Sequence, residues 1–269
     1  MTVIHDMPEH EYHAHPALSS TGARRILESP ARFKWDQTHR VQKRDFDVGH
    51  AVHAKVLGVG SPVEVLDFDS FRTKASQEAR DAAYEAGRVP MLAKDMYPIN
   101  AMTEAVLSHR VARELFEQPG HAEASVFATD PETDVGMRAR FDYLPDFTAP
   151  TPTAVDLKTA VNASPDGFAK VAAEYRYDIQ EEWYRLTYSL AGGDFGMPFK
   201  FVVVEKRAPY LVGVYSLAQE FAELGRGRVR DALNVYAECL ATDMWPGYPV
   251  DVDPLQPPTW LIFAEGVID

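Results

Sequence analysis

The feature that most constrains the fold is a change of pattern near residue 120. Capping residues and apolar spacing predict helices at 19–30, 46–58, 74–87 and 95–120. After this point, 124–146 contains two alternating runs around a Pro/Asp/Gly turn, which predicts a β-hairpin, and 154–160 predicts a third strand. The rest predicts a helix at 164–193, a hairpin at 200–216 and a helix at 217–243. The expected order is therefore helices, then β-β-β, α, β-β, α.

Charged residues interrupt the third predicted strand, whose sequence is AVDLKTA. Asp156 and Lys158 lie two residues apart between apolar neighbours. In an exposed strand the two charges would simply face water, because successive side chains alternate between faces. In the second strand Met137, Ala139 and Phe141 share one face, and Arg138, Arg140 and Asp142 share the other. Neighbouring strands could thus bring Asp142 to Asp156 and Lys158.

Two neighbouring carboxylates and a lysine have a chemical use of their own. Carboxylates bind Mg²⁺ or Mn²⁺, since hard cations take oxygen ligands and keep waters that a phosphate can replace. A lysine beside Asp142 and Asp156 could orient the attacking water, help deprotonate it, or neutralise phosphate charge. If the strand is not exposed, its charged residues would therefore serve the metal-assisted hydrolysis of a phosphodiester.

Composition narrows the class of protein. The chain has 269 residues, 46% hydrophobic and 25% charged, which is typical of a soluble globular protein. No apolar run approaches the roughly 18 residues of a membrane span, and the N-terminus lacks the order of a signal peptide, so we expect a cytoplasmic protein without a membrane partner. The single cysteine, Cys239, excludes an internal disulfide framework and an iron–sulfur cluster built within one chain.

The net charge of −13 argues against a surface coated in basic residues for nucleic-acid binding, but a local basic groove remains possible. Basic residues do cluster near the N-terminus, at Arg24, Arg25, Arg32, Lys34, Arg40, Lys43 and Arg44. The alternative for this cluster is a solvated helix face. The aromatics Phe33 and Trp35 within it are expected in the core, with stacking on a DNA end as the alternative.

The order of these motifs resembles the PD-(D/E)XK nuclease core: a hairpin, an aspartate, D-x-K 14 residues later, and a helix. The GHAVH stretch, which ends at His53, is similar to the G-x-x-x-H helix of the RecB-type and exodeoxyribonuclease VIII branch. QEEWY supplies Gln180 and Tyr184, similar to the Q-x-x-x-Y motif of that branch. The segments EYHAHPALSSTGARRILESPARFKW, FRTKASQEAR and ASPDGFAKVAAEYRYDIQ also resemble exodeoxyribonuclease VIII-like nucleases of phages and prophages. The resemblance covers nearly the whole chain.

The resemblance implies a single nuclease domain over 1–269, with an α/β (α+β) fold built on a mixed sheet. A mainly helical part, 1–120, would carry the histidine motif and pack on a central sheet formed by 121–269. His53, Asp142 and Asp156 would bind metal, Mg²⁺ with Mn²⁺ as a substitute. The catalytic residues would be Asp142, Asp156, Lys158, Gln180 and Tyr184. Gln180 and Tyr184 would face the active site and touch DNA, and Glu123, placed just before the first strand, would be a possible additional acid.

The chain also departs from the family pattern, and several residues keep an alternative. Phe141 stands where the motif has proline, and the second acid is Asp156 where glutamate is frequent. An iron–sulfur relative exists in the branch, but this chain lacks the cysteines. Taken alone, His53 would be an ordinary core or surface histidine, and Gln180 and Tyr184 a simple helix-face pair. The other eight histidines are interpreted as structural or solvated, and Glu205 as a strand-end carboxylate.

Three functions follow from these expectations. The first is a Mg²⁺-dependent exonuclease that degrades one strand of duplex DNA from the 5′ side and leaves 3′ overhangs for recombination. The second is a structure-specific endonuclease with the same chemistry, and the third a catalytically silent DNA-binding module. The expected DNA contacts are Arg24, Arg25, Lys34, Arg138 and Arg140. Resemblance further implies a ring-like homo-oligomer and a single-strand annealing protein as partner.

Overall fold

The computed structural model describes residues 3–39, 47–248, 254–258 and 262. Its helices are α1 (Glu9–Ala14), α2 (Ser20–Glu28), α3 (Pro30–Thr38), α4 (Asp47–Leu57), α5 (Lys74–Glu85), α6 (Met96–Ser108), α7 (Arg110–Glu117), α8 (Pro165–Glu174), α9 (Tyr177–Leu190) and α10 (Gln219–Thr242). Its strands are β1 (Val3–Ile4), β2 (Leu18–Ser19), β3 (Val63–Leu66), β4 (Val89–Leu92), β5 (Gly120–Thr129), β6 (Gly136–Pro145), β7 (Ala154–Ala160), β8 (Phe199–Glu205) and β9 (Val212–Tyr215).

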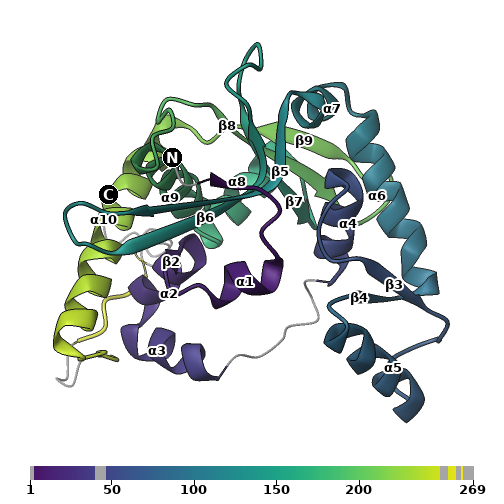
Figure 1. Ribbon diagram of the computed structural model, residues 1–269, viewed down its shortest axis with the longest axis horizontal. Helices are drawn as coiled ribbons and strands as arrows, with labels where there is room; N and C mark the ends of the chain where they lie inside the picture. Colours follow the sequence, from purple (N-terminus) through teal and green to yellow (C-terminus); the bar gives the residue numbers. More distant parts are fainter. Residues whose placement is uncertain (1–2, 40–46, 249–253, 259–261, 263–269) are drawn as a thin grey trace.

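A mixed seven-stranded sheet forms the centre of the molecule (Figure 1). Its strand order is β1-β5-β6-β7-β8-β9, and the short β2 pairs with β6 in parallel. The neighbours β5, β6 and β7 are antiparallel, β7 and β8 are parallel, and β8 and β9 form the second hairpin. The parallel pair β3 and β4 makes a separate small sheet.

The two faces of the central sheet bury different sets of side chains. One cluster joins the sheet to α2, α8, α9 and α10, around Trp183, Phe141 and Leu233. The other joins the opposite face to α4, α6 and α7, around Ile99 and Leu157. Helices therefore cover both faces, and α2 and α4, close in sequence, lie on opposite sides of the sheet (Figure 1). The α/β fold with helices of the N-terminal part packed on a mixed sheet is confirmed.

Local sequence explains most helix boundaries. The sequence offers Ser19 or Ser20 as the cap of α2, and the structure has Ser19, whose hydroxyl accepts from the amide of Gly22. Helix α4 ends just before Gly58, whose φ is 70°. Pro30 ends the expected helix, but it also begins α3, with Ser29 as the cap. The hairpins at 124–146 and 200–216 and the helix at 217–243 are confirmed, within a few residues at their ends.

Two predicted helices are each divided into two. The helix expected at 95–120 breaks at His109, whose ring caps α7 by accepting from the amide of Ala112. The helix expected at 164–193 breaks at Arg176, which has the left-handed φ of 56°. This break lets α9 change direction and lie along α10, where a Cβ on Gly225 would come within 2.5 Å of the Asp178 carbonyl. Helical spacing continued through both breaks, so periodicity alone could not locate them.

The elements that were not predicted are α1, α3 and the strands β1 to β4. Apart from α3, they are too short for a periodic signal, and tertiary contacts form them. In the described ranges, no helix has the length and apolar character that crossing a membrane requires. The predicted basic cluster is only partly described, because Arg40, Lys43 and Arg44 lie outside the described residues.

Candidate active site

The candidate site lies between β6 and β7. These antiparallel strands are in register at Tyr143 and Val155. Two residues further along β7, the amide of Leu157 donates to Asp142 Oδ2 at 2.6 Å. The carboxylate therefore replaces a ladder carbonyl as the acceptor for this amide, and Asp142 is fixed at the opening between the strands.

His53 reaches the same opening from α4, on the sheet face that also buries Ala51 and Val52. Its Nε2 lies 2.6 Å from the carbonyl oxygen of Leu157, which can only accept, so Nε2 carries the proton. Nδ1 then has a free lone pair, and it lies 3.5 Å from Asp142 Oδ2. Burial lowers the pKa of His53 to about 4, which keeps the ring neutral at pH 7. Metal-ligating histidines commonly donate their second ring N–H to a carbonyl in this way.

Glu123 completes a group of three side chains. One ligand atom each from His53, Glu123 and Asp142 lies within 4.8 Å of the other two. The sequence predicted Glu123 just before the first strand, but it lies inside β5. Its φ is 52°. A left-handed glutamate inside a strand is unusual and costs backbone energy. Opposite it the alternation of β6 shifts, since Phe141 and Leu144 contribute to the same core cluster.

Asp156 is adjacent but has different partners. Its side chain is almost fully buried; Oδ1 accepts from Gln180 Nε2 at 2.5 Å, and Oδ2 lies 2.6 Å from Lys158 Nζ. The structure thus unites Asp156, Lys158 and Gln180, and places this trio beside the group of His53, Glu123 and Asp142. Metal binding by Asp156 stays a prediction.

The charges of the site favour a bound cation. Burial raises the pKa of Asp142 well above its ordinary range, and the Asp156 carboxylate raises it further. Burial also raises the pKa of Glu123, although Arg140 opposes this. A carboxylate with a raised pKa lacks sufficient positive charge nearby. A hard divalent cation would supply that charge, and the donor set of one imidazole nitrogen and carboxylate oxygens fits Mn²⁺ or Mg²⁺.

Lys158 stays charged in this environment. Burial by itself would lower the pKa of its ammonium, but the carboxylates of Asp156 and Asp142 and the Tyr177 phenol together raise it. The ammonium also lies 4.8 Å from the centre of the Tyr177 ring, a cation–π contact. Tyr177, the first residue of α9, was not predicted as a site residue, because no spacing rule ties it to D-x-K.

Gln180 and Tyr184 both point from α9 toward the sheet and are buried. Gln180 contacts Asp156, so this residue does lie at the site. Tyr184 packs against Phe141, with ring centres 4.9 Å apart, and burial raises its pKa well above the ordinary value. Contact of either side chain with DNA stays a prediction.

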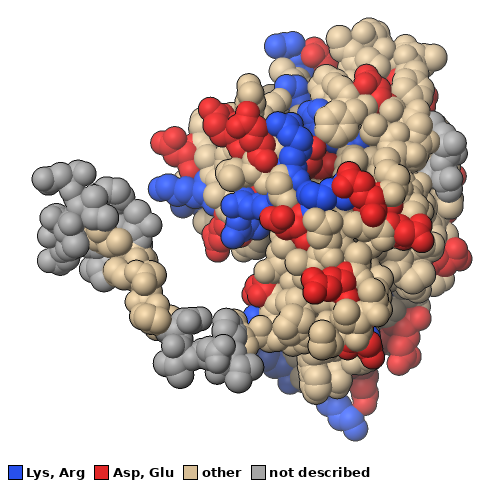
Figure 2. All heavy atoms as spheres, turned by 90° about the vertical axis from the view of Figure 1, so that its left-hand side faces the viewer, with Lys and Arg blue, Asp and Glu red and all other residues tan. Residues whose placement is uncertain are grey.

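The predicted basic residues do not form one surface. Arg24 donates to the Tyr175 carbonyl at 2.6 Å, two residues before Tyr177 at the start of α9. Arg25 pairs with Asp36 at 3.7 Å, and Lys34 pairs with Asp243 at 3.8 Å. Figure 2, seen from the α10 side, shows Lys and Arg mixed with Asp and Glu across that face.

The aromatics next to these basic residues differ in burial. Phe33 packs in the core against Tyr236, as expected. Trp35 is 62% exposed and stacks on His39, so its predicted place in the core is wrong.

Arg138 and Arg140 bind the N-terminal segment, which is defined here as residues 5–17. Arg138 donates to the carbonyls of Tyr12 and His15, and Arg140 to the carbonyl of Met7. Contact of these arginines with DNA stays a prediction, and the structure shows another use of their guanidinium groups. The sequence could not indicate this, because main-chain acceptors leave no signal in the residue types.

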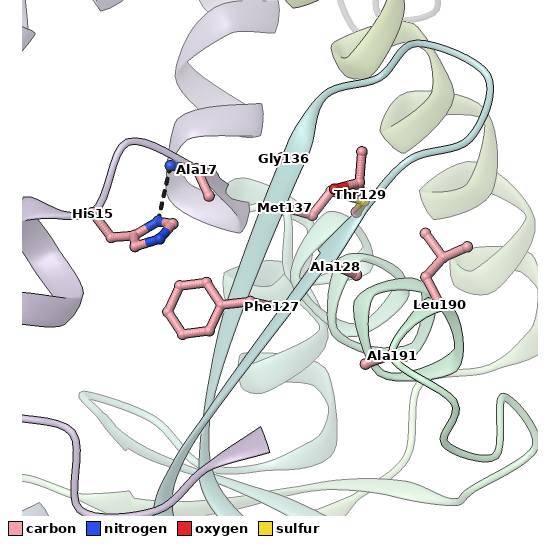
Figure 3. Close-up of a pocket in the computed structure, with 9 residues that line it drawn as sticks. All are labelled: His15, Ala17, Phe127, Ala128, Thr129, Gly136, Met137, Leu190 and Ala191. Carbon is pink, nitrogen blue, oxygen red and sulfur yellow. Dashed lines mark hydrogen bonds between the residues drawn. The ribbon is translucent and has the colours of Figure 1, made fainter. Parts of the chain in front are cut away.

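A separate surface pocket lies at the β5–β6 hairpin (Figure 3). His15, Phe127, Met137 and Leu190 are among its lining residues, and none of the lining residues belongs to the site. There, Nδ1 of His15 accepts a hydrogen bond from the amide of Ala17, which agrees with the structural role expected for this histidine. Glu205 ends β8 and accepts from the buried amide of Ala163, so its interpretation as a strand-end carboxylate is confirmed.

Comparison with known proteins supports this description. Residues 19–255 match the model of a family described as a PDDEXK-like domain of unknown function (DUF3799). A crystal structure described as a "putative exonuclease" from Eubacterium rectale is similar, with a TM-score of 0.61, 10% identity, and 98% of this chain and 99% of that chain covered. The crystal structure of SSO0001 has a TM-score of only 0.29 at 12% identity, with 80% of this chain and 84% of that chain covered, which is too low to indicate a shared fold. No curated protein matches the sequence.

Proposed function

This chain belongs to the family of PDDEXK-like domains of unknown function (DUF3799), and on that premise we propose that it is a divalent-metal-dependent DNA nuclease. The resemblance to PD-(D/E)XK proteins deduced from the sequence agrees with this family. The site comprises His53, Glu123 and Asp142 as a metal-binding group, with Asp156 as a further candidate ligand and Lys158 as the catalytic lysine.

The observation that carries the proposal is the pair of contacts that the two ring nitrogens of His53 make. A histidine that served only the core would need no free lone pair directed at two carboxylates. Here Nε2 donates to Leu157, which leaves Nδ1 facing Asp142 at 3.5 Å. A bound divalent cation would supply positive charge to the phosphate and to the attacking water. We propose Mg²⁺ as the physiological ion, with Mn²⁺ binding more tightly because of the imidazole ligand.

Lys158 would orient the attacking water and offset the negative charge that develops on the phosphate. Its raised pKa means that the ammonium remains protonated, so it acts as a donor and not as the base that removes the proton. Asp156 fixes the ammonium at 2.6 Å, and Gln180 fixes Asp156 from the other side. This chain of contacts holds the reacting group without requiring movement of α9.

For the substrate, we propose the ends of double-stranded DNA, degraded from the 5′ side to leave 3′ overhangs for recombination. The neighbour described as a "putative exonuclease" supports an exonuclease over an endonuclease. Arg24, which binds the Tyr175 carbonyl two residues before Tyr177, is proposed to meet a phosphate at the site. A cytoplasmic location, a ring-like homo-oligomer and a single-strand annealing partner remain part of the proposal by resemblance.

Cleavage of labelled DNA tests the proposal. Linear duplexes labelled at the 5′ or the 3′ end, and a covalently closed circle, are incubated with protein in Mg²⁺, Mn²⁺ or EDTA. We expect release from the 5′ end of linear DNA with either metal, none in EDTA, and an intact circle. Asp142→Asn should abolish cleavage. Asp146→Asn is the matched control, because Asp146 lies just past the end of β6 and pairs with His121 at the surface.

Two other results would replace the proposal. Cleavage of the circle would identify the structure-specific endonuclease. Tight DNA binding without cleavage in either metal would identify the catalytically silent binding module.

A further inference from the structure

Arg140 has an unusual set of contacts at the edge of the metal-binding group. Its Nε lies 2.9 Å from Glu123 Oε2 and 3.3 Å from the carbonyl oxygen of the same residue. One guanidinium nitrogen therefore lies within reach of both the side chain and the backbone of Glu123. Nη2 donates to the Met7 carbonyl, and the guanidinium lies 5.1 Å from the centre of the Tyr12 ring.

Glu123 needs such support, because its φ of 52° is a conformation that residues other than glycine rarely adopt in a strand. Strained residues of this kind persist where their surroundings determine the geometry. Arg140 binds Oε2, and one carboxylate oxygen of Glu123 lies within 4.8 Å of the ligand atoms of His53 and Asp142. The strained backbone and the ion pair thus act together to fix the Glu123 carboxylate beside His53 and Asp142.

We propose that Arg140 is a positioning residue that holds Glu123 in place as a metal ligand. This inference rests on the proposed function, since it assumes a cation bound by His53, Glu123 and Asp142. It assigns to Arg140 a role other than contact with DNA. Its side chain is only 12% exposed, and Nη1 is buried and without a hydrogen-bond partner among the described residues, so a phosphate could not reach it without rearrangement.

Two opposing effects on metal affinity must be separated in any test. The positive charge of Arg140 repels a cation, whereas its geometry presents a ligand to that cation. Arg140→Lys keeps the charge, but a lysine cannot reproduce the planar group that spans Glu123, Met7 and the Tyr12 ring. The substitution therefore changes the geometry while the electrostatic repulsion stays nearly constant.

Arg138 offers a matched control two residues away on the same strand face. Its guanidinium also binds the N-terminal segment, donating to the His15 carbonyl at 2.8 Å, and lies 4.8 Å from the centre of the same Tyr12 ring. On β5 its register partner is Phe127, four residues away from Glu123. Arg138→Lys thus perturbs the N-terminal segment to a similar degree and leaves the ligand alone.

The experiment measures Mn²⁺ affinity of the full chain without DNA, by calorimetry or by electron paramagnetic resonance. We expect Arg140→Lys to weaken Mn²⁺ binding by about 10- to 100-fold, the range typical of residues that orient a ligand, and Arg138→Lys by less than about twofold. Affinity of Arg140→Lys for duplex DNA in EDTA should stay within about twofold of wild type.

Equal Mn²⁺ affinity in Arg140→Lys and wild type would overturn the inference, as would a loss of DNA affinity in EDTA without loss of metal affinity. If the wild-type protein binds no Mn²⁺, the proposed function fails instead, so the two failures are distinguishable. If Arg140→Lys does not fold, a crystal structure of the wild type with Mn²⁺ decides. Glu123 bound to both Arg140 and the ion would support the inference, and Glu123 turned away from the ion would overturn it.

Discussion

The protonation of His53 gives a prediction whose size follows from the structure. Burial lowers the pKa of His53 from 6.5 to about 4, while the unfolded chain keeps the ordinary value. Between these two pH values the unfolded state binds the proton and the folded state does not. The free energy of unfolding therefore falls as the pH is lowered from 6.5 to 4. At about 1.4 kcal/mol for each pKa unit, this one group costs about 3 kcal/mol of stability by pH 4.

His53→Gln is the matching perturbation, because a glutamine amide can still donate to the Leu157 carbonyl but does not titrate. Urea unfolding of both proteins in EDTA, at several pH values from 4 to 8, measures the difference. Asp142 and Glu123 have raised pKa values that act in the opposite direction, and both proteins retain them, so the comparison isolates His53. NMR of the imidazole gives its pKa directly. A His53 resonance that titrates near pH 6.5, with parallel stability curves for the two proteins, would refute the buried neutral ring.

Three further predictions follow from other parts of the structure. Asp156→Ala should reduce cleavage by orders of magnitude and lower the free energy of unfolding in urea by about 3–5 kcal/mol, because it leaves Lys158 charged and without this partner. Asp156→Asn should be equally inactive but more stable. Wild-type cleavage in either variant would contradict the assignment. DNA affinity in EDTA, followed by fluorescence anisotropy, should fall steeply between about 50 and 200 mM salt despite the net charge of −13, and a flat response would exclude a basic path to the site. Burial raises the pKa of Glu181 to about 7, so the wild type should lose up to about 3 kcal/mol of stability as the pH rises from 4.5 through 7. Glu181→Gln should lack this pH dependence. If the stability of both proteins in urea changes with pH in the same way, the pKa of Glu181 is not raised.

The sequence predicted the larger elements because their patterns are local. Met137, Ala139 and Phe141 do share one face of β6, which is buried, and α2 does start at the serine pair Ser19 and Ser20. The breaks at His109 and Arg176 were missed, because helical spacing continues through both of them. The short strands β1 and β2 exist only through pairing with β5 and β6, which no local window contains.

The candidate site was predicted in its residues and only partly in its arrangement. The motif spacings identified His53, Asp142, Asp156 and Lys158, and the structure brings them to one opening in the sheet. The sequence could not show that Glu123 would have a left-handed φ and join His53 and Asp142, or that Asp156 would pair with Lys158 and Gln180. Nor could it show that Arg138 and Arg140 bind main-chain carbonyls of the N-terminal segment, because every residue type provides that acceptor.

The most direct test of the catalytic site is the single-turnover rate of DNA cleavage in Mg²⁺ by Lys158→Ala, with Mn²⁺ affinity measured on the same preparation. Lys74→Ala is the control, since Lys74 lies on α5 and its side chain is 90% exposed. The account predicts that Lys158→Ala binds Mn²⁺ nearly as the wild type does but cleaves about 10² to 10⁴ times more slowly, the range for one positioned charge-stabilising group. A cleavage rate within about twofold of the wild type would contradict the catalytic role of Lys158, and with it the central claim about this site.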